Sequence, residues 1–389
     1  MSAPGVPPAA APRAGRPALS VLVVAEQLRR VVPGGIGTYT RGLVTGLGAL
    51  DPELAPLVTL AASRAPRSGG DAVAALGPAV RTVGLGPRAL VAAWDHGLAR
   101  VGRDASVVHA CSTLTPPSSA PLVATVHDLA WRHLEWAFPP RGRRWHEASL
   151  RRAVRRASAI VVPSEAVADE VREEVASVRG RSPCDVAVVD EGADHLPAPD
   201  DRAAAAALDA LGVTGEYLLA VGTLEPRKNL VRLVEAYAAA RPSLPEPWPL
   251  VVVGPAGWGR STGVEAPPPG VVLAGVVGDA ELAALYARAR CVAYVPLLEG
   301  YGLPVVEAMR AGAPVVASAV PSARGAALEV DPLDVDSIAA GLVVAATDGE
   351  RRARLVAAGL ERTGGLTWRR CAEQHVALWR RVVAAGAAT

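Results

Sequence analysis

The sequence predicts an α/β protein made of two doubly wound domains that face each other across a central cleft. Short Val-, Ile- and Leu-rich runs alternate with helical patterns along most of the 389 residues. The runs are continuously apolar, which suits strands buried on both faces of a parallel sheet. The chain is longer than one ordinary core requires, and hydrophobic residues make up 50% of it, so two cores can form.

Each half is expected to hold five strands with helices between them. In the first half we expect strands at 20–25, 107–110, 122–126, 159–163 and 185–189, and helices near 37–49, 146–157 and 164–178. In the second half we expect strands at 217–222, 249–254, 271–275, 291–295 and 314–318, and helices near 229–240, 279–290 and 303–311. Ligands of such sheets lie outside the carboxyl ends of the strands, so both halves should present their loops to one cleft.

Changes in composition indicate the domain boundaries. Residues 1–17 are rich in Pro, Ala and Gly and are expected to form a disordered tail. The first domain is expected over 18–195 and the second over 213–365, with an acidic and then Ala-rich linker, 190–213, between them. The amphipathic pattern of the last segment predicts a helix within 366–389 that packs back toward the first domain.

Charge, cysteine content and hydropathy exclude several classes of protein. The net charge of +2 provides no overall field for nucleic-acid binding. The four cysteines form no C-x-x-C pair, so neither a zinc site nor a disulfide framework is expected. The apolar run LSVLVVA is too short for a secretion signal, and nothing is long enough to span a membrane. These features predict a cytoplasmic protein.

One loop contains Lys228, the only lysine in a chain whose other basic side chains are arginines. Lys228 and Arg227 lie in VGTLEPRKN, between an apolar strand and a helix, where the helix dipole disfavours cations. An anion bound between them would explain the pair. An ammonium is a compact charge suited to one phosphate oxygen, whereas a guanidinium is a planar fork. The hypothesis is that each side chain holds one phosphoryl oxygen; the alternative is a solvated basic pair in a turn.

A second loop, LLEGYGLPVVEAMRAGAPVVAS (297–318), places two glutamates and two glycines around a helix start. Gly300 and Gly302 let the backbone approach a ligand closely, and the free amides that follow form an anion site. Because carboxylates repel phosphates, Glu299 and Glu307 are better suited to accept hydrogen bonds from sugar hydroxyls. In the alternative interpretation, Glu299 interacts with the helix dipole and Glu307 is a surface charge.

Together, VGTLEPRKNL and EGYGLPVVEAMRAGAPVVAS resemble the signatures of retaining glycosyltransferases of family 4, which have the GT-B fold of two Rossmann-like domains. The order of the motifs fits over about residues 19–385. The resemblance implies that Arg227 and Lys228 bind the nucleotide diphosphate. It also implies that Glu299 contacts the transferred sugar and Glu307 the ribose hydroxyls, with acceptor binding in the first domain and donor binding in the second. The remaining donor-binding residues would be Gly35, Gly37, Val277, Gly300, Tyr301, Gly302 and Leu303.

Two further loops fit this resemblance. The glycine loop VPGGIGTYT (32–40) would reach across the cleft to the donor phosphates and the acceptor. It lacks the third glycine and the acidic ribose partner of dinucleotide-binding oxidoreductases, so that class is disfavoured. His127 ends a strand in ATVHDLAW, and in similar enzymes this histidine lies beside the reacting centre. Asp128 is expected to orient it, and a half-buried structural histidine is the alternative.

The resemblance implies transfer of a hexosyl group from a nucleoside diphosphate sugar to a glycan or lipid-linked acceptor, with retention of anomeric configuration. The LEPRKN motif is more typical of the mannosyl-transferring members of this family, so GDP-mannose is the expected donor. No cofactor or metal is expected, and the only D-x-D, at 334–336, is interpreted as helix capping. The segment 319–332 is shorter than in the family and lacks the family's Pro-Glu pair. The resemblance therefore does not assign a donor-binding role to the nearby loop. A nucleotide-sugar epimerase of the same fold and a non-catalytic sugar-nucleotide binding protein remain as alternatives.

The basic stretch RGRRWHEASLRRAVRRAS (141–158) holds seven arginines. On a helix, Arg152, Arg155 and Arg156 would share one face. Peripheral docking on the anionic inner face of a membrane is one interpretation, and a solvated basic helix is the other.

Overall fold

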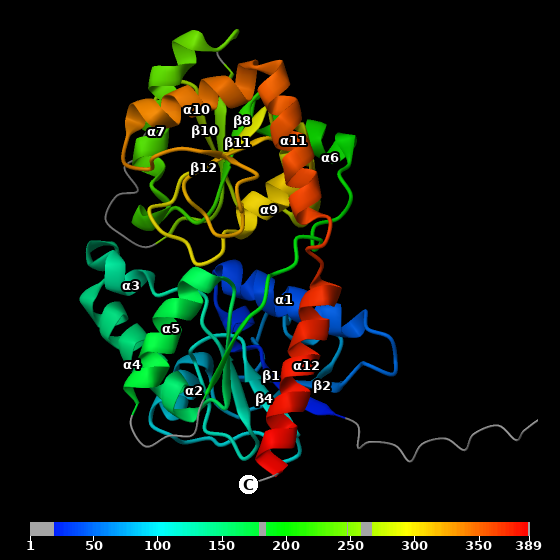
Figure 1. The fold of residues 1–389 in the computed structure, drawn as a ribbon. Helices are drawn as coiled ribbons and strands as arrows, with labels where there is room; N and C mark the ends of the chain where they lie inside the picture. Colours follow the sequence, from blue (N-terminus) through cyan, green and yellow to red (C-terminus); the bar gives the residue numbers. More distant parts are fainter. Residues whose placement is uncertain (1–18, 179–183, 247, 258–266, 388–389) are drawn as a thin grey trace, which may run out of the picture.

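The computed structural model describes residues 19–178, 184–246, 248–257 and 267–387. It contains two parallel sheets, each flanked by helices, in two halves that are stacked one on the other (Figure 1). The expected α/β class, with two doubly wound sheets, is confirmed. The tail expected at 1–17 lies outside the described residues.

The N-terminal sheet has seven parallel strands in the order β3-β2-β1-β4-β5-β6-β7. Its strands are β1 (Ser20–Val24), β2 (Leu57–Ala62), β3 (Ala79–Thr82), β4 (Val107–Ala110), β5 (Leu122–Thr125), β6 (Ala159–Val162) and β7 (Asp185–Val188). The helices of this half are α1 (Gly34–Gly48), α2 (Pro87–Asp95), α3 (Ala130–His133), α4 (Pro140–Arg156) and α5 (Glu165–Ser177). Short 3-10 segments are η1 (Glu26–Arg29), η2 (Ala74–Leu76) and η3 (Glu135–Ala137).

The C-terminal sheet has six parallel strands in the order β10-β9-β8-β11-β12-β13. Its strands are β8 (Leu218–Val221), β9 (Leu250–Val253), β10 (Val271–Gly275), β11 (Cys291–Tyr294), β12 (Val315–Ala317) and β13 (Leu328–Glu329). The helices of this half are α6 (Asp201–Ala210), α7 (Leu230–Ala240), α8 (Asp279–Arg288), α9 (Leu303–Arg310), α10 (Val335–Thr347) and α11 (Gly349–Thr363). The 3-10 segments are η4 (Pro226–Lys228) and η5 (Arg241–Ser243).

The strand order of each sheet reverses at one point, and this determines where a ligand can bind. The reversal lies between β1 and β4 in the first sheet and between β8 and β11 in the second. In open α/β sheets the ligand crevice opens at this switch point, outside the carboxyl ends of the strands. The glycine loop follows β1, the loop with Lys228 follows β8, and the loop with Glu299 follows β11. Three of the motifs singled out in the sequence therefore follow strands at the two switch points, and the His127 motif follows β5, next to β4.

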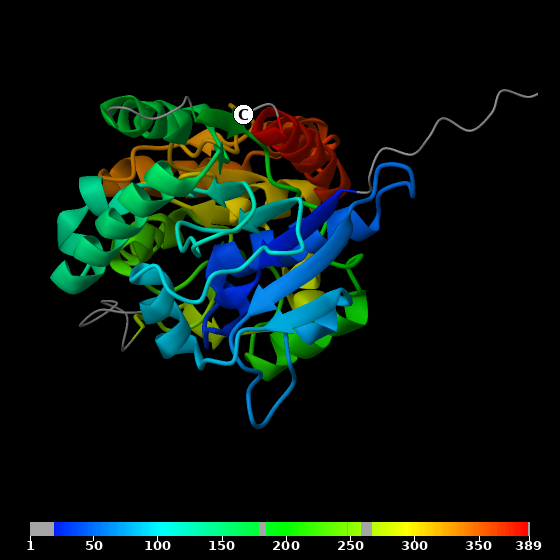
Figure 2. The same ribbon diagram turned by 90° about the horizontal axis from the view of Figure 1, so that it is seen from below.

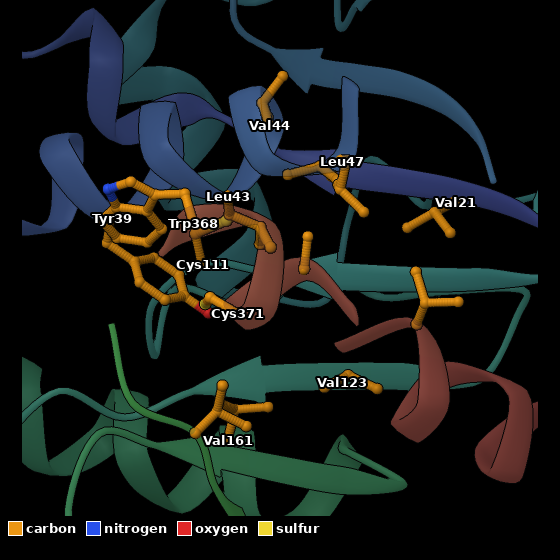
Figure 3. Close-up of a cluster of buried hydrophobic side chains, with 14 of the residues drawn as sticks. Val21, Tyr39, Leu43, Val44, Leu47, Cys111, Val123, Val161, Trp368 and Cys371 are labelled. Carbon is orange, nitrogen blue, oxygen red and sulfur yellow. The ribbon is translucent and has the colours of Figure 1, made fainter. Parts of the chain in front are cut away.

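The last helix, α12 (Trp368–Ala387), crosses back from the C-terminal half and packs on α1 (Figure 1). Figure 2 views the molecule from below, with the N-terminal half in front and α12 in red along it. Trp368, at the start of α12, lies beside Tyr39 of α1, with ring centroids 6.0 Å apart (Figure 3). Tyr301 and Leu303 of the C-terminal half belong to the same buried cluster. The two halves thus share apolar packing.

Most of the expected elements are present, with shifts of a few residues, and three expectations need correction. Helix α1 begins at Gly34 instead of near 37, so the glycine loop forms its first turn. The expected linker 190–213 contains helix α6, capped by the Asp200 carboxylate. Strands β2 and β3 extend the first sheet beyond the strands expected, and β13 extends the second. Across the described part of the chain, none of the helices combines the length and apolar character that crossing a membrane requires.

Candidate active site

Two cations and one carboxylate meet at the switch point of the C-terminal sheet. Arg227 and Lys228 lie in η4, after β8, and Glu299 lies in the loop after the neighbouring strand β11. Arg227 Nη1 donates to Glu299 Oε1 at 2.6 Å, and Lys228 Nζ forms an ion pair with the same oxygen. Tyr294, the last residue of β11, accepts from Lys228 Nζ at 2.6 Å and donates to Glu299 Oε1 at 2.9 Å. A second carboxylate, Glu225, accepts from Arg227 Nη2 at 2.7 Å.

This cluster is mostly buried, so its charges interact strongly. The exposed fractions of the Arg227, Lys228 and Glu299 side chains are 14%, 17% and 11%. Burial lowers the pKa of Lys228, and the charge of Glu299 does not fully offset this. Burial alone would raise the pKa of Glu299, but the charges of Arg227 and Lys228 outweigh it and lower this pKa to about 2. The site therefore holds two cations beside the carboxylates of Glu299 and Glu225, and its expected binding of a diphosphate stays a prediction.

The start of helix α9 lies beside this cluster in the same loop, and glycines determine its geometry. Gly302 caps α9 with φ of 100°, and a side chain there would collide with Val320. The first N–H groups of a helix have no partner within the helix and can bind an anion. Gly300 packs so closely on the N-terminal half that a Cβ atom would lie 1.7 Å from the carbonyl oxygen of His127. Its own carbonyl accepts from Ser164 Oγ at 2.8 Å. Gly300 therefore allows close contact between the two halves, whereas the sequence indicated close contact with a ligand.

Glu307 is a buried carboxylate on α9, not a surface charge. Tyr286 of α8 donates to its Oε2 at 2.8 Å, and His195 Nε2 lies 3.0 Å from its Oε1. The alternative interpretation of Glu307 as a solvated residue is thus wrong. Its expected contact with ribose hydroxyls stays a prediction.

His127 lies at the carboxyl end of β5 and faces two acceptors. Its Nδ1 is 3.3 Å from Glu191 Oε1, and its Nε2 is 2.9 Å from the carbonyl oxygen of Cys111. Burial alone would lower the pKa of His127, but the Glu191 carboxylate and the Cys111 carbonyl outweigh it, and this pKa is raised. A protonated imidazole, which donates from both nitrogens, satisfies both partners. The group that orients His127 is Glu191; Asp128 instead accepts from the amide of Ala130, at the start of α3.

The remaining donor-binding candidates lie in loops or at helix starts. Gly35 lies in the first turn of α1, and the space where its Cβ would be is open. Gly37 lies in the same helix as Gly35 and packs on Pro33, which caps the helix. Val277 precedes α8, and its side chain packs against the core of the C-terminal half; its expected role in donor binding stays a prediction. Tyr301 donates from its hydroxyl to the carbonyl of Glu191 at 3.1 Å, across the boundary between the halves.

Four residues of the site were not identified from the sequence. Glu225 and Tyr294 follow or end strands at the switch point, so the same rule that identified Lys228 could have found them. Glu191 and His195 lie in the segment 190–195, which links the two halves. No local pattern marks them, because their position depends on how the halves pack together.

Two further sequence expectations concern metals and membranes. In the described ranges, no group of three or more His, Cys, Asp or Glu residues is arranged to hold a metal ion. Asp334 caps α10, with its side chain accepting from the amide of Asp336, as the capping interpretation predicted. In the basic helix α4, Arg152 pairs with Asp95, and Arg156 donates to the carbonyl of Thr115 at 3.1 Å. Two of the three arginines on this face thus contact other groups of the protein. Membrane docking by this face stays a prediction.

Known families match both halves of the chain. The family described as "Glycosyltransferase Family 4" matches residues 33–195, and "Glycosyl transferases group 1" matches residues 209–362. The O-antigen chain mannosyltransferase B of Escherichia coli is 36% identical over 169 residues, which cover 41% of this chain and 44% of that protein. The MMP alpha-(1->4)-mannosyltransferase of Mycolicibacterium hassiacum is 30% identical over 289 residues, which cover 69% of this chain and 67% of that protein.

A third relative, the serotype-specific mannosyltransferase WbdA of Escherichia coli, is 29% identical over 243 residues, which cover 57% of this chain and 28% of that protein. The chain thus spans less than half of the length of both Escherichia coli relatives.

Solved structures resemble the whole fold. Sucrose-phosphate synthase from Thermosynechococcus elongatus aligns with a TM-score of 0.70 and 19% identity, over 94% of this chain and 100% of that one. HepE of Anabaena, solved in complex with UDP and glucose, aligns with a TM-score of 0.66 and 18% identity, over 93% of this chain and 100% of that one. At these identities the likeness concerns the fold, two facing doubly wound domains.

Proposed function

The chain belongs to the group 1, family 4 glycosyltransferases with the GT-B fold, and from this premise we propose that it is a retaining, mannosyltransferase-like enzyme. It transfers a hexosyl group from a nucleoside diphosphate sugar to a glycan or lipid-linked acceptor. The observation that carries the proposal is the convergence of Arg227 and Lys228 on Glu299, next to the start of α9. Two cations and free helix amides at one switch point form a site for a diphosphate.

The proposed chemistry depends on charge that develops on the leaving diphosphate. When the bond from the anomeric carbon to the phosphate oxygen breaks, negative charge grows on that oxygen. Arg227 and Lys228 are already in place in a mostly buried site, so their field needs little reorganisation. Removing one preorganised donor of this kind costs roughly 10²–10³ in turnover in other enzymes.

Retention is proposed to arise from attack on the same face of the sugar from which the diphosphate leaves. The leaving diphosphate would take the proton from the acceptor hydroxyl, so the new glycosidic bond forms as the old bond breaks. Glu299 is held by Arg227, Lys228 and Tyr294, which makes it an orienting acceptor for sugar hydroxyls and a poor nucleophile. A double displacement would instead need a free carboxylate beside the anomeric carbon.

Mannose is the proposed sugar because relatives in sequence are named as mannosyltransferases. GDP-mannose is accordingly the first donor to test. HepE, which has a similar fold, was solved with UDP-glucose. UDP sugars are therefore the second set of donors to test.

A donor and acceptor screen tests the proposal. GDP-mannose, UDP-glucose and other nucleotide sugars are incubated with mannosyl-oligosaccharide and polyprenyl-linked acceptors, and products are analysed by mass spectrometry and NMR. The expected result is an extended acceptor whose new bond has the anomeric configuration of the donor. A free sugar nucleotide with altered stereochemistry would identify an epimerase, and donor binding without turnover on any acceptor would indicate a binding protein.

A further inference from the structure

Each carboxylate oxygen of Glu307 has one polar side-chain neighbour. Tyr286 donates to Oε2 at 2.8 Å, and His195 Nε2 lies 3.0 Å from Oε1. A carboxylate has about four lone-pair sites, so two remain for further donors. The two side chains therefore fix the plane of the carboxylate and leave it able to accept from a pair of neighbouring hydroxyls.

The tautomer of His195 follows from its second contact. Trp368 Nε1 donates to His195 Nδ1 at 3.3 Å. An indole nitrogen is a donor only, so Nδ1 must be the acceptor and Nε2 must carry the proton. His195 thus receives a hydrogen bond from Trp368 on Nδ1, and its protonated Nε2 lies 3.0 Å from Glu307 Oε1.

His195 and Trp368 lie where the chain passes between the two halves. His195 ends the segment 190–195, and Trp368 begins α12, the helix that returns to the N-terminal half. The segment 190–195 and the start of α12 are hydrogen-bonded to each other, because Asp194 Oδ1 accepts from the amide of Trp368 at 2.8 Å. A Cβ atom on Gly42 of α1 would lie 2.1 Å from the ring of Trp368, and a Cβ atom on Gly46 would lie 2.1 Å from its carbonyl oxygen. Trp368 is therefore held tightly against the helix that follows the glycine loop.

From this geometry we propose that His195 is a positioning residue, which orients Glu307 for the ribose of the donor and ties that carboxylate to the connection between the halves. The proposal rests on the proposed function, in which Glu307 accepts from the ribose hydroxyls. Loss of the His195 imidazole would remove the polar neighbour of Glu307 Oε1. The carboxylate would then be held only by the hydrogen bond from Tyr286. Its orientation would be less fixed, and the preference for ribose over dideoxyribose would fall.

The test compares ribose with deoxyribose, which isolates the role of Glu307 from general folding. Calorimetry measures the Kd of GDP and of 2′,3′-dideoxy-GDP, or of the UDP pair if the wild type binds only uridine nucleotides. The wild type is expected to prefer the ribonucleotide by about 10-fold or more, because hydrogen bonds to a charged group are lost with the hydroxyls. His195→Phe is expected to lower this preference several-fold while binding of the dideoxynucleotide changes little. His195→Gln, which keeps an N–H donor and an acceptor, should restore most of the preference.

One further variant is a control, and a second is a substitute for His195→Phe. Arg324→Ala removes a contact of Asp190 with the C-terminal half that does not involve Glu307, and it should leave the ribose preference unchanged. Trp368→Phe keeps an aromatic ring but removes the indole N–H; it is expected to lower the preference partly, and it replaces His195→Phe if that variant does not fold.

The outcomes separate the two proposals. If the wild type binds neither nucleotide pair, or does not distinguish ribose from dideoxyribose, the assignment of Glu307 fails and this inference fails with it. If the wild type prefers ribose and His195→Phe, or its substitute, keeps the full preference, the inference alone is overturned.

Discussion

The ammonium of Lys228 lies between the phenol of Tyr294 and the carboxylate of Glu299. The guanidinium of Arg227 already uses its planar fork on Glu225, on Glu299 and on the carbonyl of Leu298. A second guanidinium beside it would place a broad planar group where a compact charge now fits. The contacts thus give a physical reason why the only lysine of the chain is found here.

Lys228→Ala is expected to lower kcat by roughly 10²–10³-fold, because one preorganised charge on the leaving diphosphate is lost. The fold should persist, since Glu299 keeps its bonds to Arg227 and Tyr294. Initial rates with the donor from the screen, together with a thermal melt, measure both effects. Lys228→Arg keeps the charge with the wrong shape and should recover only part of the activity. Wild-type turnover in Lys228→Ala would remove Lys228 from the mechanism.

At the scale of elements, the strands that could be predicted are those buried on both faces, such as β4, β5, β6 and β9. Strand β3 was missed because it is largely exposed and its sequence, AVRT, forms no apolar run. The convergence of Lys228 and Glu299 was predictable, since both follow neighbouring parallel strands. The contacts of Glu191 and His195 were not, because tertiary packing between the halves places them.

The packing of α12 on α1 depends on small residues. A Cβ atom on Gly42 would lie 2.1 Å from the ring of Trp368, so Gly42→Ala should destabilise the protein by about 1–3 kcal/mol through overpacking. Gly48, at the end of the same helix, has open space around it, so Gly48→Ala serves as the matched control and should be neutral or slightly stabilising. Chemical denaturation of both variants measures the difference. Equal stabilities would show that α12 does not pack on α1 in this way.

At the scale of the whole molecule, buried titratable groups predict that acid destabilises the fold. Burial lowers the pKa of His375 on α12 to about 4 and holds the pKa of neighbouring His109 well below its usual value of 6.5. Between about pH 6.5 and pH 4 the unfolded chain binds protons at these positions that the folded chain does not, so stability falls as the pH falls. The pKa of Glu299, lowered to about 2, extends the loss of stability below pH 4.5.

Urea denaturation between pH 7 and pH 4.5 checks this expectation. The midpoint should fall steadily with pH in the wild type. His375→Gln, which removes one titrating group but keeps a polar partner for Tyr39, should show a shallower dependence. The same slope in both proteins would mean that His375 does not contribute to acid sensitivity.

In the proposed function, the two halves present Arg227, Lys228 and the start of α9 to the diphosphate of a sugar nucleotide. A crystal structure of the complex with the nucleoside diphosphate of the donor tests it most directly. We expect phosphate oxygens within hydrogen-bonding distance of Lys228 Nζ, of the Arg227 guanidinium and of the amides at 302–303. A diphosphate bound elsewhere, with Lys228 and Arg227 still paired only to Glu299, would contradict it.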